Sequence, residues 1–369
     1  MGETRSGTRM VRRLVARGAP VAGEVGLNVA IALGLLFLVI AAGGHDAAPA
    51  LRALWDGSFG SAYALGSATF VRAVPLLLAG LGVTLAFRAG VWNIGAEGQL
   101  LAGATAAALI ALDAPRALGA LALPVALAAG AAAGAGWAGI AALLRRRFGV
   151  LEVISTIMLN FIAVYLVGYL VRGPLQEPTH IYPQSAALDA MARLPRLLAG
   201  SRLHWGALIA LAAAPALWWA LSRTAAGFRV RAVGENPDAA RNAGEIDVER
   251  TRERAFLLSG AFAGLAGAIE LTGVTFALYE NLSPGYGFTA IAVALLARLD
   301  PLAVVLTAVL FAGLESGALA MEREAGIPAA TVSIVEGALI LIALAGSSAE
   351  MRRIRARMSG QLATAGLGR

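Results

Sequence analysis

Long apolar stretches separated by short polar segments recur along the whole chain. About 20 apolar residues in an α-helix are enough to cross the roughly 30 Å hydrocarbon core of a bilayer. The pattern predicts about ten transmembrane helices, within a range of eight to ten. Their approximate bounds are 25–43, 70–90, 97–113, 118–144, 152–171, 204–222, 254–277, 286–299, 302–321 and 328–346. The eighth stretch is short and bordered by glycines, which is typical of a broken or re-entrant helix.

The composition supports an all-α polytopic membrane protein. Hydrophobic residues make up 58% of the 369 positions and charged residues 14%, against roughly 45–50% and about 25% in soluble proteins. A single soluble core cannot bury so much apolar surface. We therefore predict one transmembrane domain over 25–346, with an arginine-rich cytoplasmic N-terminus at 1–24 and a cytoplasmic C-terminal tail at 347–369.

Several residue types are missing, and their absence narrows the chemistry. Cysteine is absent, and all 30 basic residues are arginine. Without lysine the chain has no nucleotide-binding P-loop and no Schiff base. His45, His180 and His204 stand far apart in the sequence, which disfavours a metal site. The net charge of +7 fits arginine-rich loops at anionic lipid rather than nucleic acid. We expect no catalytic residue, metal or cofactor in this chain.

The arginines also indicate the topology, because cytoplasmic loops collect positive residues. With ten spans and both termini cytoplasmic, the inner segments hold 22 of the 30 arginines. Removing or adding one span in the middle of the chain would move the later loops to the opposite side, and the arginines would no longer be concentrated on the inner side. The distribution therefore supports the ten-span topology independently of hydrophobicity.

Two connections are too long to be simple turns. The outer one, about 172–203, contains four prolines and is expected to lie over the membrane surface. The inner one, 223–254, is polar throughout, with six acidic residues beside its seven arginines.

The inner connection contains signals for one short amphipathic helix. Asn236 before Pro237 is typical of a helix start, and Gly244 of a helix stop. The pattern predicts a helix from Pro237 to Ala243. Two interpretations remain: a surface helix that fills a long loop, or a docking helix for a cytoplasmic partner.

A second informative segment, G-V-W-N-I-G-A-E-G-Q at 90–99, places Asn93, Glu97 and Gln99 among glycines between two spans. A charged group at the middle of a bilayer costs roughly 2.5–3.5 kcal/mol, so it normally faces a polar partner or a cavity. Glycines allow a helix to break and backbones to approach closely. The alternative is an interfacial turn with Glu97 exposed to water.

The motif N-I-G-A-E-G-Q followed by a small-residue helix resembles the nucleoside-type permeases of bacterial ABC importers. These belong to the branched-chain amino acid and simple-sugar permease superfamily. The resemblance continues through E-V-I-S-T-I-M-L-N at 152–160 and R-A-V-G-E-N-P-D-A-A at 231–240. It includes S-G-A-F-A-G-L-A-G-A-I-E at 259–270 and G-Y-G-F-T-A-I-A-V-A-L-L at 285–296, so it covers about 70–345.

The resemblance implies a non-enzymatic subunit that moves a nucleoside-like solute across the bacterial cytoplasmic (inner) membrane. The implied partners are a cytoplasmic ATP-binding subunit, which uses the ATP, an extracellular or periplasmic substrate-binding lipoprotein, and a second permease copy or related subunit. It also implies a coupling helix seated in the ATPase. The implied coupling residues are Val233, Gly234, Glu235, Asn236, Pro237, Asp238, Ala239, Ala240 and Gly244.

Two places depart from the family pattern. Glu245 separates Gly244 from Ile246, which looks like a one-residue insertion and affects the register of the docking surface. Arg298 and Leu299 stand where the family favours glycine.

The resemblance also implies an inverted repeat of spans 2–5 and 7–10, and the predicted parity agrees with it. The expected pathway residues are Asn93, Glu97, Gln99, Asn160 and Glu270. Interhelical hydrogen bonding is an equal alternative for Asn160 and Glu270. It is also the alternative for three other polar residues in the spans, Glu152, Glu315 and Glu336. Aromatic groups that could face a base or a sugar are Phe161, Tyr165, Phe276 and Tyr279.

Other functions remain open from the sequence. Within transport, a simple-sugar or branched-chain amino acid ABC permease fits nearly as well. An ion-coupled secondary transporter also uses inverted repeats and broken helices. An intramembrane enzyme would need a nucleophile with a base, a metal-binding pair or clustered aspartates, and the spans offer none.

Overall fold

The computed structural model describes residues 30, 31, 33–113, 118–198, 200–244 and 246–338. The predicted N-terminal segment 1–24, the tail 347–369 and the Glu245 insertion lie outside the described residues. Within the described part, the chain is helical and forms no β-strand beyond two isolated bridges.

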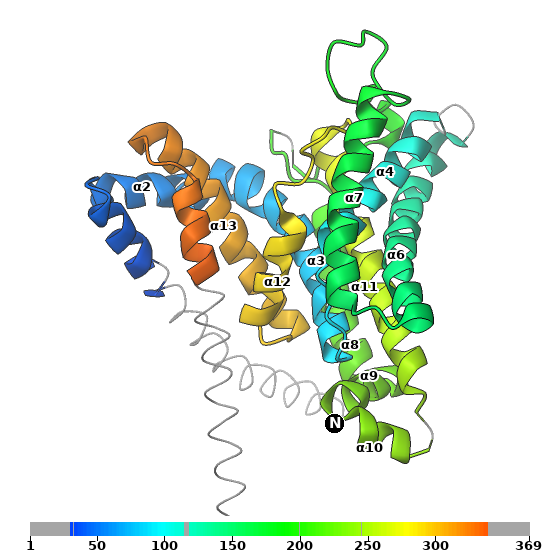
Figure 1. Ribbon diagram of the computed structural model, residues 1–369. Coiled ribbons are helices and arrows are strands. Elements are labelled where there is room, and N and C mark those ends of the chain that lie inside the picture. The colour runs from blue at the N-terminus through cyan, green and yellow to red at the C-terminus, as the bar shows by residue number, and fades with distance from the viewer. Residues whose placement is uncertain (1–29, 32, 114–117, 199, 245, 339–369) are drawn as a thin grey trace, which may run out of the picture.

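The α-helices follow in chain order (Figure 1). They are α2 Ala47–Ser58, α3 Phe70–Arg88, α4 Ala96–Asp113, α6 Ala122–Phe148, α7 Glu152–Arg172, α8 Gly206–Arg223, α9 Ala225–Glu235, α10 Pro237–Asn242, α11 Val248–Glu270, α12 Tyr286–Leu296 and α13 Pro301–Ala325. Shorter helical turns are η1 Ala64–Thr69, η2 Gly119–Leu121, η3 Ala190–Ala192 and η4 Leu271–Thr275.

Six helices in the described part are long and apolar enough to cross a membrane. They are 64–88, 119–148, 152–172, 206–223, 248–275 and 301–325. Two shorter apolar helices, Leu33–Ala42 and Tyr286–Leu296, also match predicted spans. The chain is therefore a multi-pass membrane protein, and the full count of ten stays a prediction.

Helix α11 lies at the centre of the main body (Figure 1). It packs against α3, α4 and α6, and α7 packs on α4. Close approach depends on small residues, because a Cβ atom at Gly103 of α4 or Gly134 of α6 would overlap the backbone of α11 at Gly264. In α6, Gly130 and Gly134 pack closely on the neighbouring helices, whereas Gly136 faces open space.

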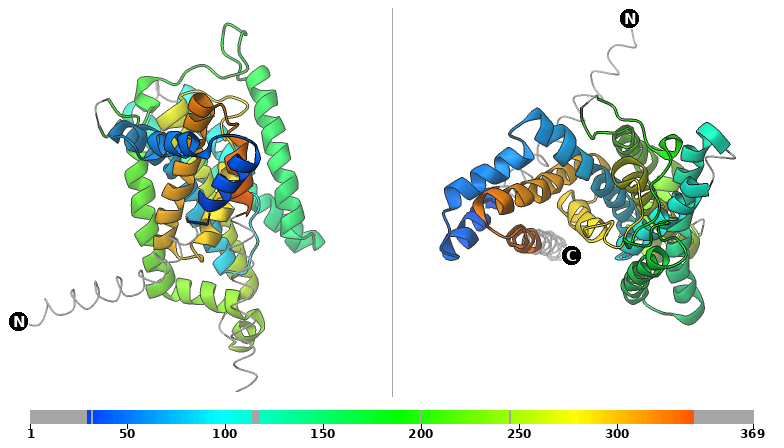
Figure 2. Two further views of the ribbon diagram at one scale, coloured as in Figure 1. Left: turned by 90° about the vertical axis from the view of Figure 1, so that its left-hand side faces the viewer. Right: turned by 90° about the horizontal axis from the view of Figure 1, so that it is seen from above.

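Helices α2 and α13 form an arm to one side of this body (Figure 2). They pack on each other and share a separate apolar cluster that includes Leu54, Leu314 and Met321. The sequence analysis missed α2, which lies in a segment read as an outer connection. A local signal nevertheless marks the start of α2, because the Asp46 carboxylate caps the helix by accepting a hydrogen bond from the Ala48 amide at 3.0 Å.

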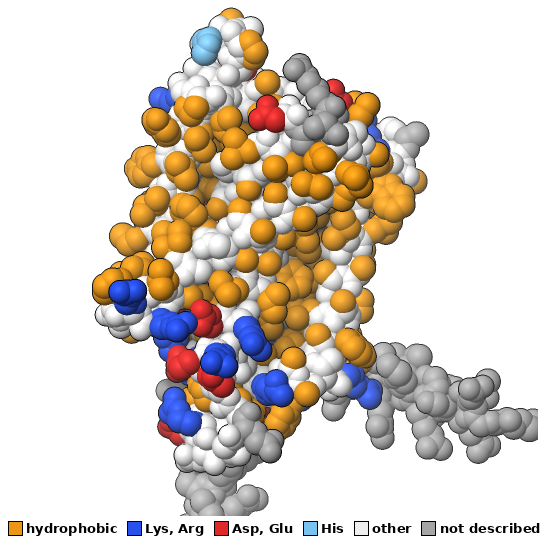
Figure 3. Space-filling model, turned by 90° about the vertical axis from the view of Figure 1, so that its right-hand side faces the viewer, with side chains coloured by type: hydrophobic (Ala, Val, Ile, Leu, Met, Phe, Trp, Pro, Cys, Tyr) orange, Lys and Arg blue, Asp and Glu red, His pale blue; other side chains and the backbone are white. Residues whose placement is uncertain are grey.

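One end of the molecule carries α9, α10 and the turn between α6 and α7, and we call it the arginine-rich end (Figure 1). Charged side chains gather there below a broad apolar belt (Figure 3). The prediction of one helix in 223–254 was incomplete, because α9 precedes α10. The Thr224 side chain caps α9 by accepting from the Gly227 amide at 3.1 Å.

Candidate functional site

The segment between α3 and α4 leaves the helical path at Ala89 and resumes it at Ala96. Asn93 is fully buried inside this break. Its amide nitrogen donates to Gln99 Oε1 at 2.9 Å and to Ser259 Oγ of α11 at 2.8 Å. Its oxygen accepts from the Gly95 amide and from Gln99 Nε2. Asn93 and Gln99 thus form a reciprocal pair that holds the break against α11.

Asn160 of α7 secures the same break from the other side. Its oxygen accepts from the Gly98 amide and its nitrogen donates to the Ile94 carbonyl, both at 2.8 Å. The first amides of a helix have no partner within the helix, and in an apolar environment such groups must be satisfied internally. Asn160 therefore supplies partners that water cannot provide.

Glu97 is 4% exposed and lies in the first turn of α4. Its Oε2 accepts from the Gly287 amide of α12 at 2.7 Å, and the Ser283 side chain also hydrogen-bonds to it. A side chain at Gly287 would overlap the backbone of Ala96 and Glu97. The N-termini of α4 and α12 therefore meet at Glu97, and the interpretation of an exposed turn is wrong.

The charge of Glu97 suits this meeting point. Each helix N-terminus carries about half a positive charge from its aligned peptide dipoles. Two such ends in contact repel each other, and one carboxylate between them offsets both. From this point α12 runs to the arginine-rich end, where Arg88 Nε donates to the Leu299 carbonyl at 2.9 Å.

Glu270, the last residue of α11, is 4% exposed. Among the described residues its side chain has no hydrogen bond and no ion pair, in contrast to the other four predicted pathway residues. It interacts electrostatically with Arg72 of α3, Arg202 and Glu315. The structure brings Asn93, Glu97, Gln99 and Asn160 together at one break and places Glu270 at the end of α11.

The remaining polar and aromatic candidates are dispersed. Glu152 forms an ion pair with Arg145 at the turn between α6 and α7. Phe161 and Tyr165 are exposed on α7, whereas Phe276 and Tyr279 lie in the second break, between α11 and α12.

The connection 173–205 hydrogen-bonds to that second break. The amides of Ser185, Leu188 and Leu194 donate to the carbonyls of Leu278, Phe276 and Thr272, each at 2.8–2.9 Å. At its edge the Arg172 guanidinium hydrogen-bonds to Glu280 at 2.6 Å and lowers the pKa of that carboxyl. Whether the connection lies over the membrane surface stays a prediction.

Helix α10 begins at the predicted Pro237 and ends at Asn242, one residue before the predicted end. The Asn236 side chain accepts a hydrogen bond from the Ala239 amide at 3.0 Å, and Pro237 is the first residue of the helix. Gly244, just after the helix, has a left-handed backbone with a φ of +76°. Val233 and Ala240 are buried against Val248 of α11 in a small apolar cluster. The predicted coupling residues that remain exposed are Glu235, Asn236, Asp238, Ala239 and Gly244; Gly234 and Pro237 are half-buried.

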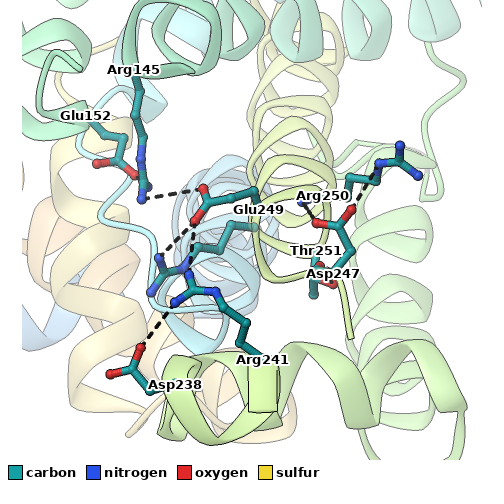
Figure 4. A network of polar contacts seen from close by, with 9 residues as sticks. Arg145, Glu152, Asp238, Arg241, Asp247, Glu249, Arg250 and Thr251 are labelled. Atoms are coloured by element: carbon teal, nitrogen blue, oxygen red, sulfur yellow. Dashed lines mark hydrogen bonds and ion pairs between the residues drawn. The ribbon is translucent and has the colours of Figure 1, made fainter. Parts of the chain in front are cut away.

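A network of ion pairs, which the sequence analysis missed, joins α10 to the helices above it (Figure 4). Glu249 of α11 lies 3.9 Å from Arg145, 4.0 Å from Arg241 and 3.8 Å from Arg252. Arg145 also pairs with Glu152, and Arg241 with Asp238 at 3.2 Å. A single exposed ion pair stabilises a fold by at most about 1 kcal/mol. The main effect of the network is therefore to connect α10, α11 and the turn between α6 and α7.

Helix α9 contacts the end of α3 at the same level. Gly234 lies against the backbone of Arg88 and Gly90, and a Cβ atom there would overlap the Arg88 carbonyl. Arg298 and Leu299 follow α12 with φ of 52° and 58°. These left-handed conformations explain why glycine would suit both positions, since each costs a non-glycine residue roughly 1–2 kcal/mol.

Comparison with known proteins decides the family. Residues 66–344 match the family described as the branched-chain amino acid transport system / permease component. The chain belongs to this permease family. It is 40% identical over 338 residues to the guanosine ABC transporter permease protein NupP of Bacillus subtilis, covering 90% of this chain and 94% of that protein. No solved structure shows a significant match.

Two other permeases are also similar to this chain over most of its length. The glucose ABC transporter permease protein TsgB13 of Haloferax volcanii is 40% identical over 344 residues, covering 90% of this chain and 88% of that protein. The nucleoside ABC transporter permease protein NupB of Lactococcus lactis is 32% identical over 323 residues, with 85% and 88% coverage. As a member of this permease family, the chain is a transport subunit and not an enzyme.

Proposed function

We propose that this chain is the permease subunit of an ATP-driven ABC importer for nucleosides or related small polar solutes. The observation that carries the proposal is the 40% identity, over 90% of the chain, to a guanosine permease. The equal identity to a glucose permease favours a simple-sugar importer as the second candidate.

The transmembrane domain is proposed to cover 25–346 in about ten spans, with both termini in the cytoplasm of a bacterial cell and the domain in its inner membrane. Helices α3 and α4 are separated by a break, and α11 and α12 repeat this arrangement. The second half-helix of each pair, α4 or α12, meets the other at its N-terminus, at Glu97. Such broken helices in opposite orientation are typical of transporters with inverted repeats. This geometry supports a repeat of spans 2–5 and 7–10.

A cytoplasmic ATP-binding subunit is proposed to dock on α10 and to use the ATP. Support comes from the exposed face of α10, which carries Asp238 and Ala239, and from the lysine-free sequence. A second permease subunit would complete the pathway. In Bacillus subtilis a second guanosine permease, NupQ, also resembles this chain, at 31% identity, which favours a heterodimer. A substrate-binding lipoprotein would deliver the solute.

The proposed pathway residues divide by their hydrogen bonding. Asn93, Gln99 and Asn160 already bind protein groups, so their proposed role is to hold the break beside the pathway. Glu97 would join the two half-helices there. Glu270 is buried, and its side chain has no hydrogen bond to described residues, which suits direct contact with the solute.

Uptake by the assembled importer tests the proposal. The chain, its ATPase, second permease and lipoprotein are reconstituted together, and ATP-dependent uptake of labelled guanosine is measured with unlabelled glucose or leucine as competitor. We expect guanosine uptake that a tenfold excess of either competitor leaves unchanged. Uptake of glucose, or competition by it, would favour the sugar importer instead.

A further inference from the structure

A cluster of charged and phenolic side chains surrounds Glu270 at the end of α11. Arg72 of α3 and Arg202 of the connection 173–205 interact with its carboxylate electrostatically. Tyr279, in the second break, and Tyr286, at the start of α12, also interact with it. The cluster therefore draws on α3, α11, α12 and the connection that lies over the second break.

Helix α13 adds a second carboxylate to the cluster. Glu315 interacts electrostatically with Arg72, Glu270 and Tyr286. Its Oε2 is buried and has no hydrogen-bond partner among the described residues. The neighbouring Ser316 hydroxyl accepts from Arg72 Nη1 at 3.4 Å, which fixes Arg72 between α3 and α13. Beyond Glu315 lies Glu336, with one carboxylate oxygen also buried and unpartnered.

These carboxylates differ from the polar groups at the first break. There, each buried side chain meets a protein donor, as in the bond from Gly287 to Glu97. Among the described residues, the Glu270 side chain has no hydrogen-bond donor and Glu315 has one buried oxygen without a donor. A buried acceptor without a donor costs folding free energy. Ionisable side chains inside a membrane domain face a pathway or cavity as a rule.

The chemistry of the cluster indicates what it can bind. A carboxylate only accepts hydrogen bonds, so a ligand that satisfies Glu270 and Glu315 must bring donors. Vicinal hydroxyl groups can each donate to one oxygen of the same carboxylate. Three carboxyl groups beside two arginines, Arg72 and Arg202, leave no excess of positive charge that would select an anion, and hydroxyl donors match the unpartnered carboxyl oxygens.

We propose that Glu270 and Glu315, beside Arg72, form a binding station for the vicinal hydroxyl groups of an uncharged solute on its way through the permease. The identity of that solute as a nucleoside, bound through its ribose, rests on the function proposed above. Tyr279 and Tyr286 border the station and can contact the rest of the molecule.

The test compares guanosine with 2′,3′-dideoxyguanosine, which lacks both ribose hydroxyls on the ring. ATP-dependent uptake by the reconstituted importer is measured over a range of concentrations for the wild type, Glu270→Gln and Glu315→Gln. Glu322→Gln, an exposed glutamate on α13, is the matched control. All variants are compared at equal membrane abundance and equal thermal stability of the purified complex.

We expect Glu270→Gln to raise KM for guanosine about tenfold, the effect of losing one hydrogen bond to a charged group. The same substitution should leave KM for the dideoxy analogue within twofold, and Glu315→Gln should act in the same direction. Equal effects on both solutes, or no effect on either, would overturn the station while leaving the nucleoside importer intact. Failure of the wild type to import guanosine would overturn the proposed function and the ribose assignment with it.

Discussion

Buried polar side chains of this protein fall into two kinds. Asn93 and Asn160 have nearly all their donors and acceptors matched to protein groups a few ångströms away. Glu270 has no such match among the described residues. Matched groups hold a conformation, whereas unmatched ones are available for a ligand.

The carboxylate of Glu97 is expected to hold the two half-helices together. Glu97→Gln keeps an acceptor for the Gly287 amide but removes the charge, whereas Glu97→Leu leaves that buried amide unpaired at roughly 1–3 kcal/mol. Thermal stability of the purified complex and its uptake rate should therefore fall in the order wild type, glutamine, leucine. Glu322→Leu, at an exposed position of α13, should change neither, and wild-type behaviour of Glu97→Leu would contradict this role.

His204 should make stability depend on pH. The residue is fully buried before α8, and its Nδ1 accepts from the Gly206 amide at 3.2 Å. Burial, helped by the charge of Arg202, lowers the pKa of His204 to about 4. The unfolded chain takes up this proton near pH 6.5 and the folded chain only near pH 4, so stability falls as the pH drops through that window and levels off below it.

Thermal unfolding in detergent at pH 7 and at pH 5 measures this effect. His204→Asn keeps an acceptor for the Gly206 amide and removes the titration. The variant should lose less stability between the two pH values than the wild type, by up to about 2 kcal/mol. Identical losses in both proteins would show that His204 does not carry this pH dependence.

At the level of elements, the ion-pair network around Glu249 is expected to transmit motion between α10 and the turn of α6 and α7. Glu249→Arg alone places three arginines around a fourth and should reduce the ratio of solute transported to ATP hydrolysed. Combining it with Arg241→Glu restores one opposite-charge pair and should recover part of that ratio. Glu322→Arg, at an exposed position of α13 that takes part in none of these ion pairs, serves as the control, and an unchanged ratio in Glu249→Arg would rule out the network as a link.

Local signals explain which elements the sequence could predict. The cap at Asn236, the proline after it and Gly244 are all within one short segment, and α10 has the predicted bounds to within one residue. Helices α2 and α9 were missed because both are short and carry polar residues. The packing partner of α2, α13, is also remote in sequence, and α9 has a remote contact with α3 besides those with its neighbours. Gly234 illustrates this, since its contact with Arg88 depends on the folded chain.

The same limit applies to the site. Small polar residues among glycines indicated a break at Asn93 and Glu97, because that pattern is local. The bond from Gly287 to Glu97 joins residues 190 positions apart, and the bond from Gly98 to Asn160 joins residues 62 apart. No spacing in the sequence specifies such pairs, so the meeting of two helix N-termini emerged only from the fold.

On the scale of the whole molecule, the first break and α10 are joined by a continuous set of contacts. Asn160 lies on α7, whose first residue, Glu152, pairs with Arg145 and so meets the network at Glu249. Movement imposed on α10 therefore has a continuous set of contacts leading to the break at Glu97. A permease that converts ATP hydrolysis elsewhere into solute movement requires such a connection.

The energy source of uptake distinguishes this mechanism from an ion-coupled transporter. Proteoliposomes containing the full importer are loaded with ATP or with a non-hydrolysable analogue, and guanosine uptake is followed with ion gradients either imposed or collapsed. We predict uptake with ATP in the compartment that contains α10, no uptake with the analogue, and no change when gradients collapse. Uptake that persists without hydrolysable ATP and follows an ion gradient would contradict the assignment of this chain as an ABC importer permease.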